Sequence, residues 1–212
     1  MAMTMSMNKI IHRAVRRDLD RFRTALAAFP DGDRDRAAAL HRAWENFDVQ
    51  LTDHHEGEHE IVWPALQQMG VTGPMLETFD EEHEAMAADL ATARAAMVRF
   101  RESASGADAD AAAGAVARLQ VTTVVHLDHE EHETEPALAE NEGHPVLKEM
   151  GRTFSRRMGP ARAGAYMAWL QDGATADEKA ALRGHVPGPV VAVLGGLLGR
   201  GYRKQIAPVW RS

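Results

Sequence analysis

Residues 54–66 read HHEGEHEIVWPAL, and residues 126–138, 72 positions later, read HLDHEEHETEPAL. In both stretches a histidine is followed four residues later by a glutamate, and both stretches end in Pro-Ala-Leu. A second pair of segments repeats at an offset of 71 residues: HRAVRRDL at 12–19 and HEAMAADL at 83–90. The chain therefore contains two similar halves, each with one isolated histidine and one His-x-x-x-Glu pair.

These motifs lie in four long segments with helical periodicity, approximately residues 9–29, 35–69, 75–101 and 109–139. Apolar residues recur every three or four positions in each segment, and turn sequences rich in glycine, proline and aspartate separate them. In each segment a histidine occupies a position of the apolar stripe. The pattern predicts an all-α fold, an up-down-up-down four-helix bundle over residues 1–143, followed by a helical C-terminal extension over residues 144–212.

The composition excludes several classes of site. The chain has 212 residues, 45% of them hydrophobic, a net charge of −7 and no cysteine. Without cysteine there are no disulfides, thiolate zinc sites or iron–sulfur clusters. An acidic chain with interspersed charges has no basic face for nucleic acid. Residues 1–8 contain no apolar run that could serve as a signal peptide, and no segment is long and apolar enough to span a membrane, so we expect a cytoplasmic protein.

The histidines and glutamates of the stripes would meet in one layer of the bundle. Burying an unpaired charge costs several kcal/mol, so six ionisable groups in a core layer do not serve stability. A pair of metal ions would neutralise the carboxylates and accept the imidazole lone pairs. Two carboxylates with two imidazoles per metal fit iron or manganese, whereas structural zinc prefers four closed ligands. The predicted metal ligands are His12, His54, Glu58, His83, His126 and Glu130.

With these residues and spacings, the chain resembles the hemerythrin family in its HHE-domain form over approximately residues 9–140. The extension is similar to those of actinobacterial HHE proteins. The resemblance implies two iron ions, Fe2+ or Fe3+ with an oxo or hydroxo bridge, held by the same six residues. It also implies that dioxygen, hydrogen peroxide or nitric oxide is the ligand.

Two positions depart from the oxygen-carrying hemerythrins. Those proteins have a fifth histidine one turn before the ligand of the third helix, where this chain has Phe79. We therefore expect one iron to lack a protein donor and to be open to a small ligand. The oxygen carriers also place the fourth-helix carboxylate five residues after its histidine, at Glu131 here. The apolar stripe instead includes Glu130, which we favour as the ligand.

Two classes of function follow from the resemblance. The first is a di-iron protein that reacts with hydrogen peroxide or nitric oxide at the open iron, with catalase-like or peroxidase-like activity. The second is a binding protein that stores oxygen reversibly, or senses oxygen, nitric oxide or iron without turnover. A ferritin-type reading rests on Glu56 and His59, which spell Glu-x-x-His, but that motif has no second copy.

The other histidines have simpler interpretations. His55, His59 and His129 lie next to the ligand positions and either orient the ligands or face solvent. We expect the remaining histidines to lie on the surface: His41, His132, His144 and His185.

The sequence of the C-terminal extension, residues 144–212, predicts further helices. Phe154–Leu170 has helical periodicity, and Thr175 with Glu178 forms a capping box. Val190–Leu198 is apolar but too short to span a bilayer, and Arg200, Arg203 and Lys204 follow it. The alternatives are an extension folded back on the bundle, or a contact with a membrane surface, a partner or a second copy. The sequence does not decide between a monomer and a dimer.

Overall fold

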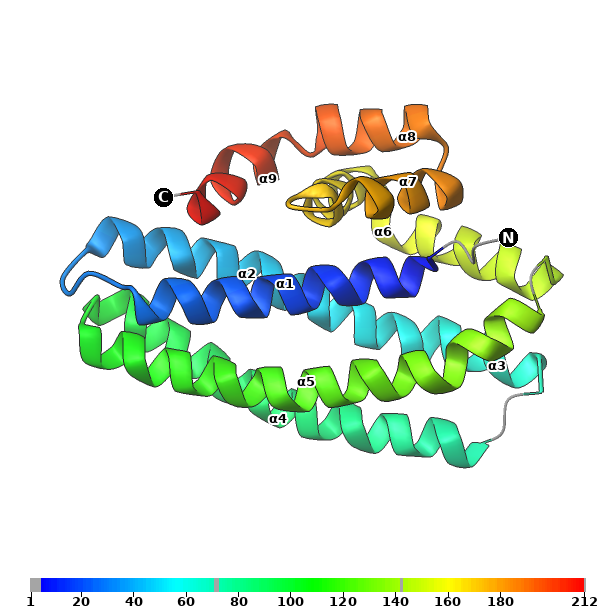
Figure 1. The fold of residues 1–212 in the computed structure, drawn as a ribbon, viewed down its shortest axis with the longest axis horizontal. Coiled ribbons are helices and arrows are strands. Elements are labelled where there is room, and N and C mark those ends of the chain that lie inside the picture. The colour runs from blue at the N-terminus through cyan, green and yellow to red at the C-terminus, as the bar shows by residue number, and fades with distance from the viewer. Residues whose placement is uncertain (1–4, 71–72, 142, 212) are drawn as a thin grey trace.

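The computed structural model describes residues 5–70, 73–141 and 143–211. Four long helices, α1, α2, α4 and α5, run alternately up and down, and α6 to α9 lie across one side of them (Figure 1). Around the bundle, α1 neighbours α5, α5 neighbours α4, α4 neighbours α2, and α2 neighbours α1. The described residues form no β-strand, and the predicted all-α four-helix bundle is confirmed.

In chain order the described residues form α1 (Met7–Ala27), α2 (Arg34–Gly57), the π-helix η1 (Glu58–Val62), α3 (Trp63–Gln68), α4 (Gly73–Ser103), α5 (Gly106–Glu140), α6 (Pro145–Gln171), α7 (Ala176–His185), α8 (Gly188–Ala192), the π-helix η2 (Val193–Leu198), α9 (Arg200–Gln205) and the 3-10 helix η3 (Ala207–Trp210). Side-chain caps begin several of them, because the first N–H groups of a helix have no partner within it. Ser6 accepts from the N–H of Lys9 at the start of α1, and Thr175 forms the predicted capping box with Glu178 at the start of α7.

The second predicted helix is not continuous. Between α2 and α3 the backbone widens into the π-turn η1, in which the N–H of Trp63 donates to the carbonyl of Glu58. Pro64 follows directly; its ring would collide with the carbonyl of Glu60 in an ordinary helix, and it has no N–H to donate. A π-turn relieves this conflict by adding one residue to the turn, and such turns are frequent at functional sites.

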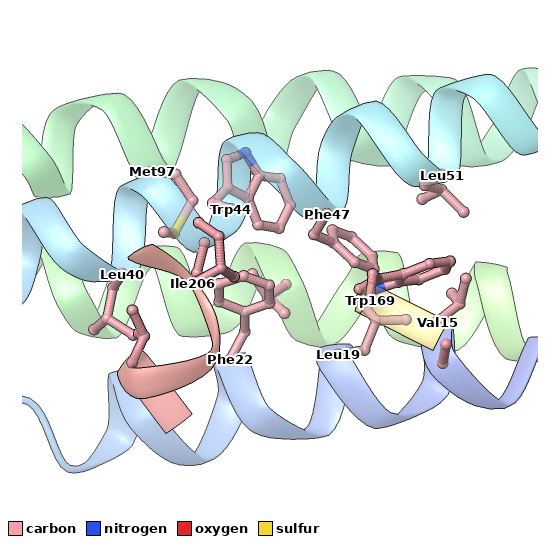
Figure 2. Packing of buried hydrophobic residues seen from close by; sticks show 14 of the residues in the cluster. Val15, Leu19, Phe22, Leu40, Trp44, Phe47, Leu51, Met97, Trp169 and Ile206 are labelled. Carbon is pink, nitrogen blue, oxygen red and sulfur yellow. The ribbon is translucent and has the colours of Figure 1, made fainter. Parts of the chain in front are cut away.

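Aromatic and aliphatic side chains fill the half of the bundle nearer the α1–α2 turn. Phe22 packs edge-on against Trp44 and Phe47, with ring centroids 5.4 and 5.7 Å apart. Figure 2 shows these residues with Val15 and Leu19 of α1, and with Trp169 and Ile206 contributed by the extension. The apolar core thus joins the bundle and the C-terminal helices.

The extension packs on α1 and α2. Its first helix, α6, begins nine residues before the predicted Phe154, because His144 caps it and Pro145 suits its first turn. Gly159, with φ of 67°, and Pro160 bend α6. Further along, the indole N–H of Trp169 donates to the buried carboxylate of Asp18 at 2.7 Å. The contact with the bundle is therefore part of the structure, while the domain division at residue 143 stays a prediction.

No single helix in the described ranges is long and apolar enough to cross a membrane. Only α7 taken together with Gly188–Leu198 reaches that length and composition, and this pair is bent by 117°. The cytoplasmic location and the oligomeric state stay predictions.

Candidate metal centre

The six predicted ligands lie in one layer of the bundle, in the half opposite the aromatic core. They come from α1, α2, η1, α4 and α5: His12, His54, Glu58, His83, His126 and Glu130. The helical period places them on inward faces, as the stripes predict. Together with one further histidine, their donor atoms form two groups that share Glu58.

The first donor group consists of His12, His54, Glu58 and Glu130, with donor atoms all within 4.8 Å of one another. The Nε2 atoms of His12 and His54 are 3.1 Å apart. His54 Nε2 lies 3.0 Å from Oε1 of Glu58, and His12 Nε2 lies 3.1 Å from Oε2 of Glu130. The group thus brings two imidazole nitrogens and two carboxylates around one point.

The second donor group consists of His55, Glu58, His83 and His126, again within 4.8 Å. The Nε2 atoms of His83 and His126 are 3.1 Å apart, and His83 Nε2 lies 3.3 Å from Oε2 of Glu58. Because Oε1 of Glu58 faces the first group and Oε2 the second, this carboxylate lies between them.

His55 lies within the second donor group; of the two predicted alternatives, facing solvent is wrong, and orienting a neighbouring ligand stays a prediction. Its ring stacks on His83 with centroids 4.5 Å apart, and its Nε2 is buried without a hydrogen-bond partner. The sequence contained a signal for this placement. On a helix Glu58 lies about 40° from His54 and about 60° from His55, so the two histidines flank the shared carboxylate on either side.

The two donor groups fit metal ions. Both carboxylate oxygens of Glu58, Oε2 of Glu130 and Nε2 of His55 are buried without a hydrogen-bond partner. Unpaired buried polar atoms cost free energy, and each group also brings two imidazole Nε2 atoms to 3.1 Å from each other. A cation in each group would satisfy all of these atoms, and a set of imidazoles and carboxylates suits iron or manganese.

A second layer of carboxylates fixes two of the imidazoles. Nδ1 of His12 lies 2.9 Å from Glu131, and Nδ1 of His126 lies 2.8 Å from Glu82. An ionised carboxylate only accepts hydrogen bonds, so each Nδ1 carries a proton, and with a metal ion bound each Nε2 would turn its lone pair to that ion. His129 donates to the same Glu82 at 2.8 Å and therefore lies beside the site. Glu82 could not be found from the repeat, because its equivalent there is an isoleucine and its proximity to His126 arises only when α4 packs on α5.

The structure distinguishes Glu130 from Glu131. Glu130 is buried in the first donor group, and Asn8 donates to its Oε1 at 3.1 Å. Glu131 points instead to the far side of His12 and accepts a hydrogen bond from Arg16 at 2.7 Å. This arrangement agrees with the preference for Glu130 as the ligand.

The charges around the two groups differ. Burial opposes protonation of His12, but Glu130 and Glu131 outweigh it and raise the pKa of His12 to about 9. Burial lowers the pKa of His126, and the neighbouring His83 lowers it further. Burial also holds the pKa of His55 well below its ordinary value. The first group is therefore rich in carboxylates, whereas in the second group burial disfavours the charged forms of His55 and His126.

Phe79 supplies no donor, as predicted, but the second donor group is not short of nitrogen. Phe79 is fully buried, and its ring packs 5.4 Å from Trp63 and 5.0 Å from His129. His55 brings the third imidazole to this group from α2 instead. The prediction that one iron lacks a protein donor and is open to a small ligand stays a prediction.

The other histidines lie mostly where predicted. His132 and His185 are exposed, and half-buried His144 caps α6. His41, predicted on the surface, is buried, and burial lowers its pKa. His59 is exposed and contacts Asp80 rather than the donor groups, which removes the ferritin-type interpretation.

The extension contacts the ligand-bearing turn. Arg157 of α6 forms ion pairs with Glu56 and Glu60, on either side of Glu58. A Cβ atom on Gly57 would lie 2.6 Å from the ring of Phe154, so only glycine permits this close packing. The C-terminal helices thus help to position the residue shared by both donor groups.

Comparison with known proteins gives one result. The family model described as hemerythrin HHE cation binding domain matches residues 9–138, more than half of the chain. The match covers all seven donor residues. No curated protein and no solved structure matches the chain.

Proposed function

Because this chain belongs to the hemerythrin HHE cation-binding family, we propose that its two donor groups bind two iron ions and bring them into contact with hydrogen peroxide or nitric oxide. The observation that carries the proposal is the position of Glu58, whose two oxygens face different donor groups. A carboxylate placed in this way suits a pair of metals better than a single ion. The proposed ligands are the six residues predicted from the sequence together with His55.

Iron is the proposed metal because the donors are nitrogen and oxygen only and are numerous enough for two ions. A bound iron pair supplies a ferrous–ferric redox couple and coordination positions for a small ligand. Each donor group offers four protein residues, fewer than the six donors of an octahedral ion. Water or a small oxidant therefore has room at either metal.

The surrounding residues determine what reaches the site and how the ligands are held. His12, Glu58, His126 and Glu130 are almost completely buried, so only small molecules would enter the layer. Glu131 and Glu82 hold the Nδ1 protons of their histidines and thereby keep each Nε2 available. Hydrogen peroxide turnover would convert two molecules of peroxide into two of water and one of oxygen, and no protein nucleophile is needed.

Reversible oxygen binding is the second candidate, and one observation favours it. With His55 the layer holds five histidines, the number that the resemblance gives for oxygen carriers, although the fifth comes from the second helix rather than the third. Sensing of oxygen, nitric oxide or iron without turnover would use the same site.

The test uses the purified full-length chain loaded with ferrous iron. We expect close to two irons per chain, an oxo-to-iron absorption in the near ultraviolet, and oxygen evolution when peroxide is added. One tightly bound zinc with no iron would refute the di-iron proposal. Two irons with a stable oxygen adduct and no oxygen evolution from peroxide would replace turnover by reversible binding.

A further inference from the structure

The segment formed by α8 and η2 packs on α6 through its smallest residues. A Cβ atom on Gly199, which ends η2, would lie 2.7 Å from the Cβ of Ala168 and 2.8 Å from the carbonyl oxygen of Gly164. A Cβ on Gly195 would lie 3.6 Å from the carbonyl oxygen of Met167. Glycines thus line the side of this segment that faces the protein.

Four large apolar residues of the same segment face outward, while Val191 is buried and Leu194 packs partly buried against the core. Val193 is 53% exposed and Leu197 is 62% exposed, and Val190 and Leu198 are also exposed. Val190, Val193 and Leu197 follow one another at helical spacing and form one stripe. A helix that only covers a protein core has the opposite arrangement, with its large apolar residues inside. An exposed aliphatic stripe of this kind suits contact with a partner outside the described residues.

The charge around the stripe identifies the chemistry of that partner. Residues 179–212 contain six lysines and arginines and no aspartate or glutamate, in a chain whose net charge is −7. Arg200, Arg203 and Lys204 directly follow the stripe and are exposed. Among the described residues, no ion pair involves these three or Arg183. The surface thus combines exposed aliphatic side chains with unpaired positive charge.

We propose that this surface, made of Val190, Val193, Leu197 and Leu198 with Arg200, Arg203 and Lys204, docks on the anionic surface of a lipid bilayer. Aliphatic side chains inserted at the headgroup boundary and cations near anionic lipids are the two features that hold such elements on membranes. Gly188–Leu198 is about 16 Å long as a helix, against about 30 Å of hydrocarbon, so it lies on the bilayer rather than across it.

Two other occupants fit less well. A stable dimer buries about 800 Å² on each copy, more than one short helical segment offers, and a symmetric pair would bring the same cations together. Nucleic acid would use the cations, but four aliphatic side chains add nothing to contacts with phosphates.

Vesicle flotation with the full-length, iron-loaded protein tests this surface. We expect binding to vesicles of phosphatidylcholine with about 30% phosphatidylglycerol, weak binding to phosphatidylcholine alone, and several-fold weaker binding at 0.5 M than at 0.1 M salt. The double variant V193D/L197D should lower binding more than tenfold, because both residues are exposed and the change places charge in the apolar stripe. The variant R200Q/K204Q should bind several-fold more weakly and with a smaller salt dependence.

The matched control is V121D/V125D, which changes two valines on α5 that are 66% and 60% exposed and lie outside this surface. It should bind vesicles as the unchanged protein does, and circular dichroism should show that all variants are folded. The proposal is overturned if the unchanged protein does not float with anionic vesicles, or if V193D/L197D floats as well as the control. A dimer in sedimentation velocity that V193D/L197D abolishes, without vesicle binding, would assign the surface to a second copy instead.

Discussion

His55 and Leu127 occupy equivalent positions of the internal repeat, directly after His54 and His126. His55 lies in the second donor group, whereas Leu127 is a buried core residue.

Asn8 and Phe79 also occupy equivalent positions of the internal repeat. Asn8 donates to Glu130, whereas Phe79 packs against Trp63 and His129. The repeat therefore places the donor residues that both halves have in common, and the positions at which the halves differ make the two donor groups chemically different.

The backbone also differs between the halves. Pro64 and Pro136 are equivalent, yet the π-turn occurs only before Pro64, and α5 continues through Pro136 as one helix. Arg157 holds Glu56 and Glu60 at the first turn. The side chains at the equivalent positions, Asp128 and His132, are exposed. An external contact from the extension thus distinguishes the two halves at the ligand-bearing turn.

The largest loss of iron is expected from a change at Glu58, which belongs to both donor groups. Glu58→Ala should remove both irons, because each oxygen of this carboxylate faces one donor group. Glu130→Ala should leave about one iron per chain, because Glu130 belongs only to the first group. Iron analysis of the purified variants measures this, with the exposed Glu133→Ala, outside both donor groups, as a control that keeps close to two irons. Equal loss in the Glu58 and Glu130 variants would show that both carboxylates are shared.

Exchanging the residues that distinguish the halves should affect one iron. His55→Leu gives the first half the residue of the second, and iron should fall from about two to about one per chain. Adding Phe79→His to this variant places an imidazole next to His126, whose ring lies 5.9 Å from that of Phe79, and should restore much of the iron. The exposed His59→Leu is the control and should change nothing. Full iron content in His55→Leu would mean that His55 only packs on His83.

In the metal-free protein, the opposite pKa shifts of His12 in the first donor group and of His55 and His126 in the second should make the free energy of unfolding depend on pH. The pKa of His12 is raised to about 9. Its contribution to the free energy of unfolding is therefore complete below about pH 6.5 and is lost as pH rises through 9. Its magnitude is roughly 3 kcal/mol for a shift of this size. The pKa values of His55 and His126 are lowered, so these residues destabilise the fold as pH falls below about 6.5.

Urea unfolding of the metal-free protein should therefore give a maximum of the free energy of unfolding near pH 6.5. His12→Gln should flatten the alkaline side only. A maximum that stays in place with unchanged slopes in this variant would contradict the assignment. NMR titration should also place the pKa of His12 near 9 and those of His55 and His126 below 6.5.

The smallest effect is expected for the hydrogen bond that only the first half has. Asn8→Ala removes the donor to Oε1 of Glu130. A hydrogen bond to a charged group contributes about 1.5 kcal/mol or more, so iron in the first group should bind roughly tenfold more weakly. Competition with a chelator should show one weakened iron and one unchanged iron. Equal weakening of both would mean that Asn8 supports the layer as a whole.

The sequence by itself determined the bundle, and it predicted the six donor residues with Glu130 rather than Glu131 among them. These follow from the spacing of residues along each helix, which is a local property. Because a helix has 3.6 residues per turn, the spacing of residues directly tells which of them lie on the same face. The internal repeat also indicated which residue of one half corresponds to which residue of the other. Phe79 could be read as a position without a donor for the same reason.

Only the tertiary structure decided which neighbours complete the site. His55 becomes part of the second donor group because His83 of α4 stacks on it, and Glu82 reaches His126 because α4 packs on α5. The burial of His41 and the contact of Arg157 with the turn around Glu58 likewise depend on helices far apart in the chain. Contacts between helices depend on how their faces meet in space, and residue spacing within one helix does not contain that information.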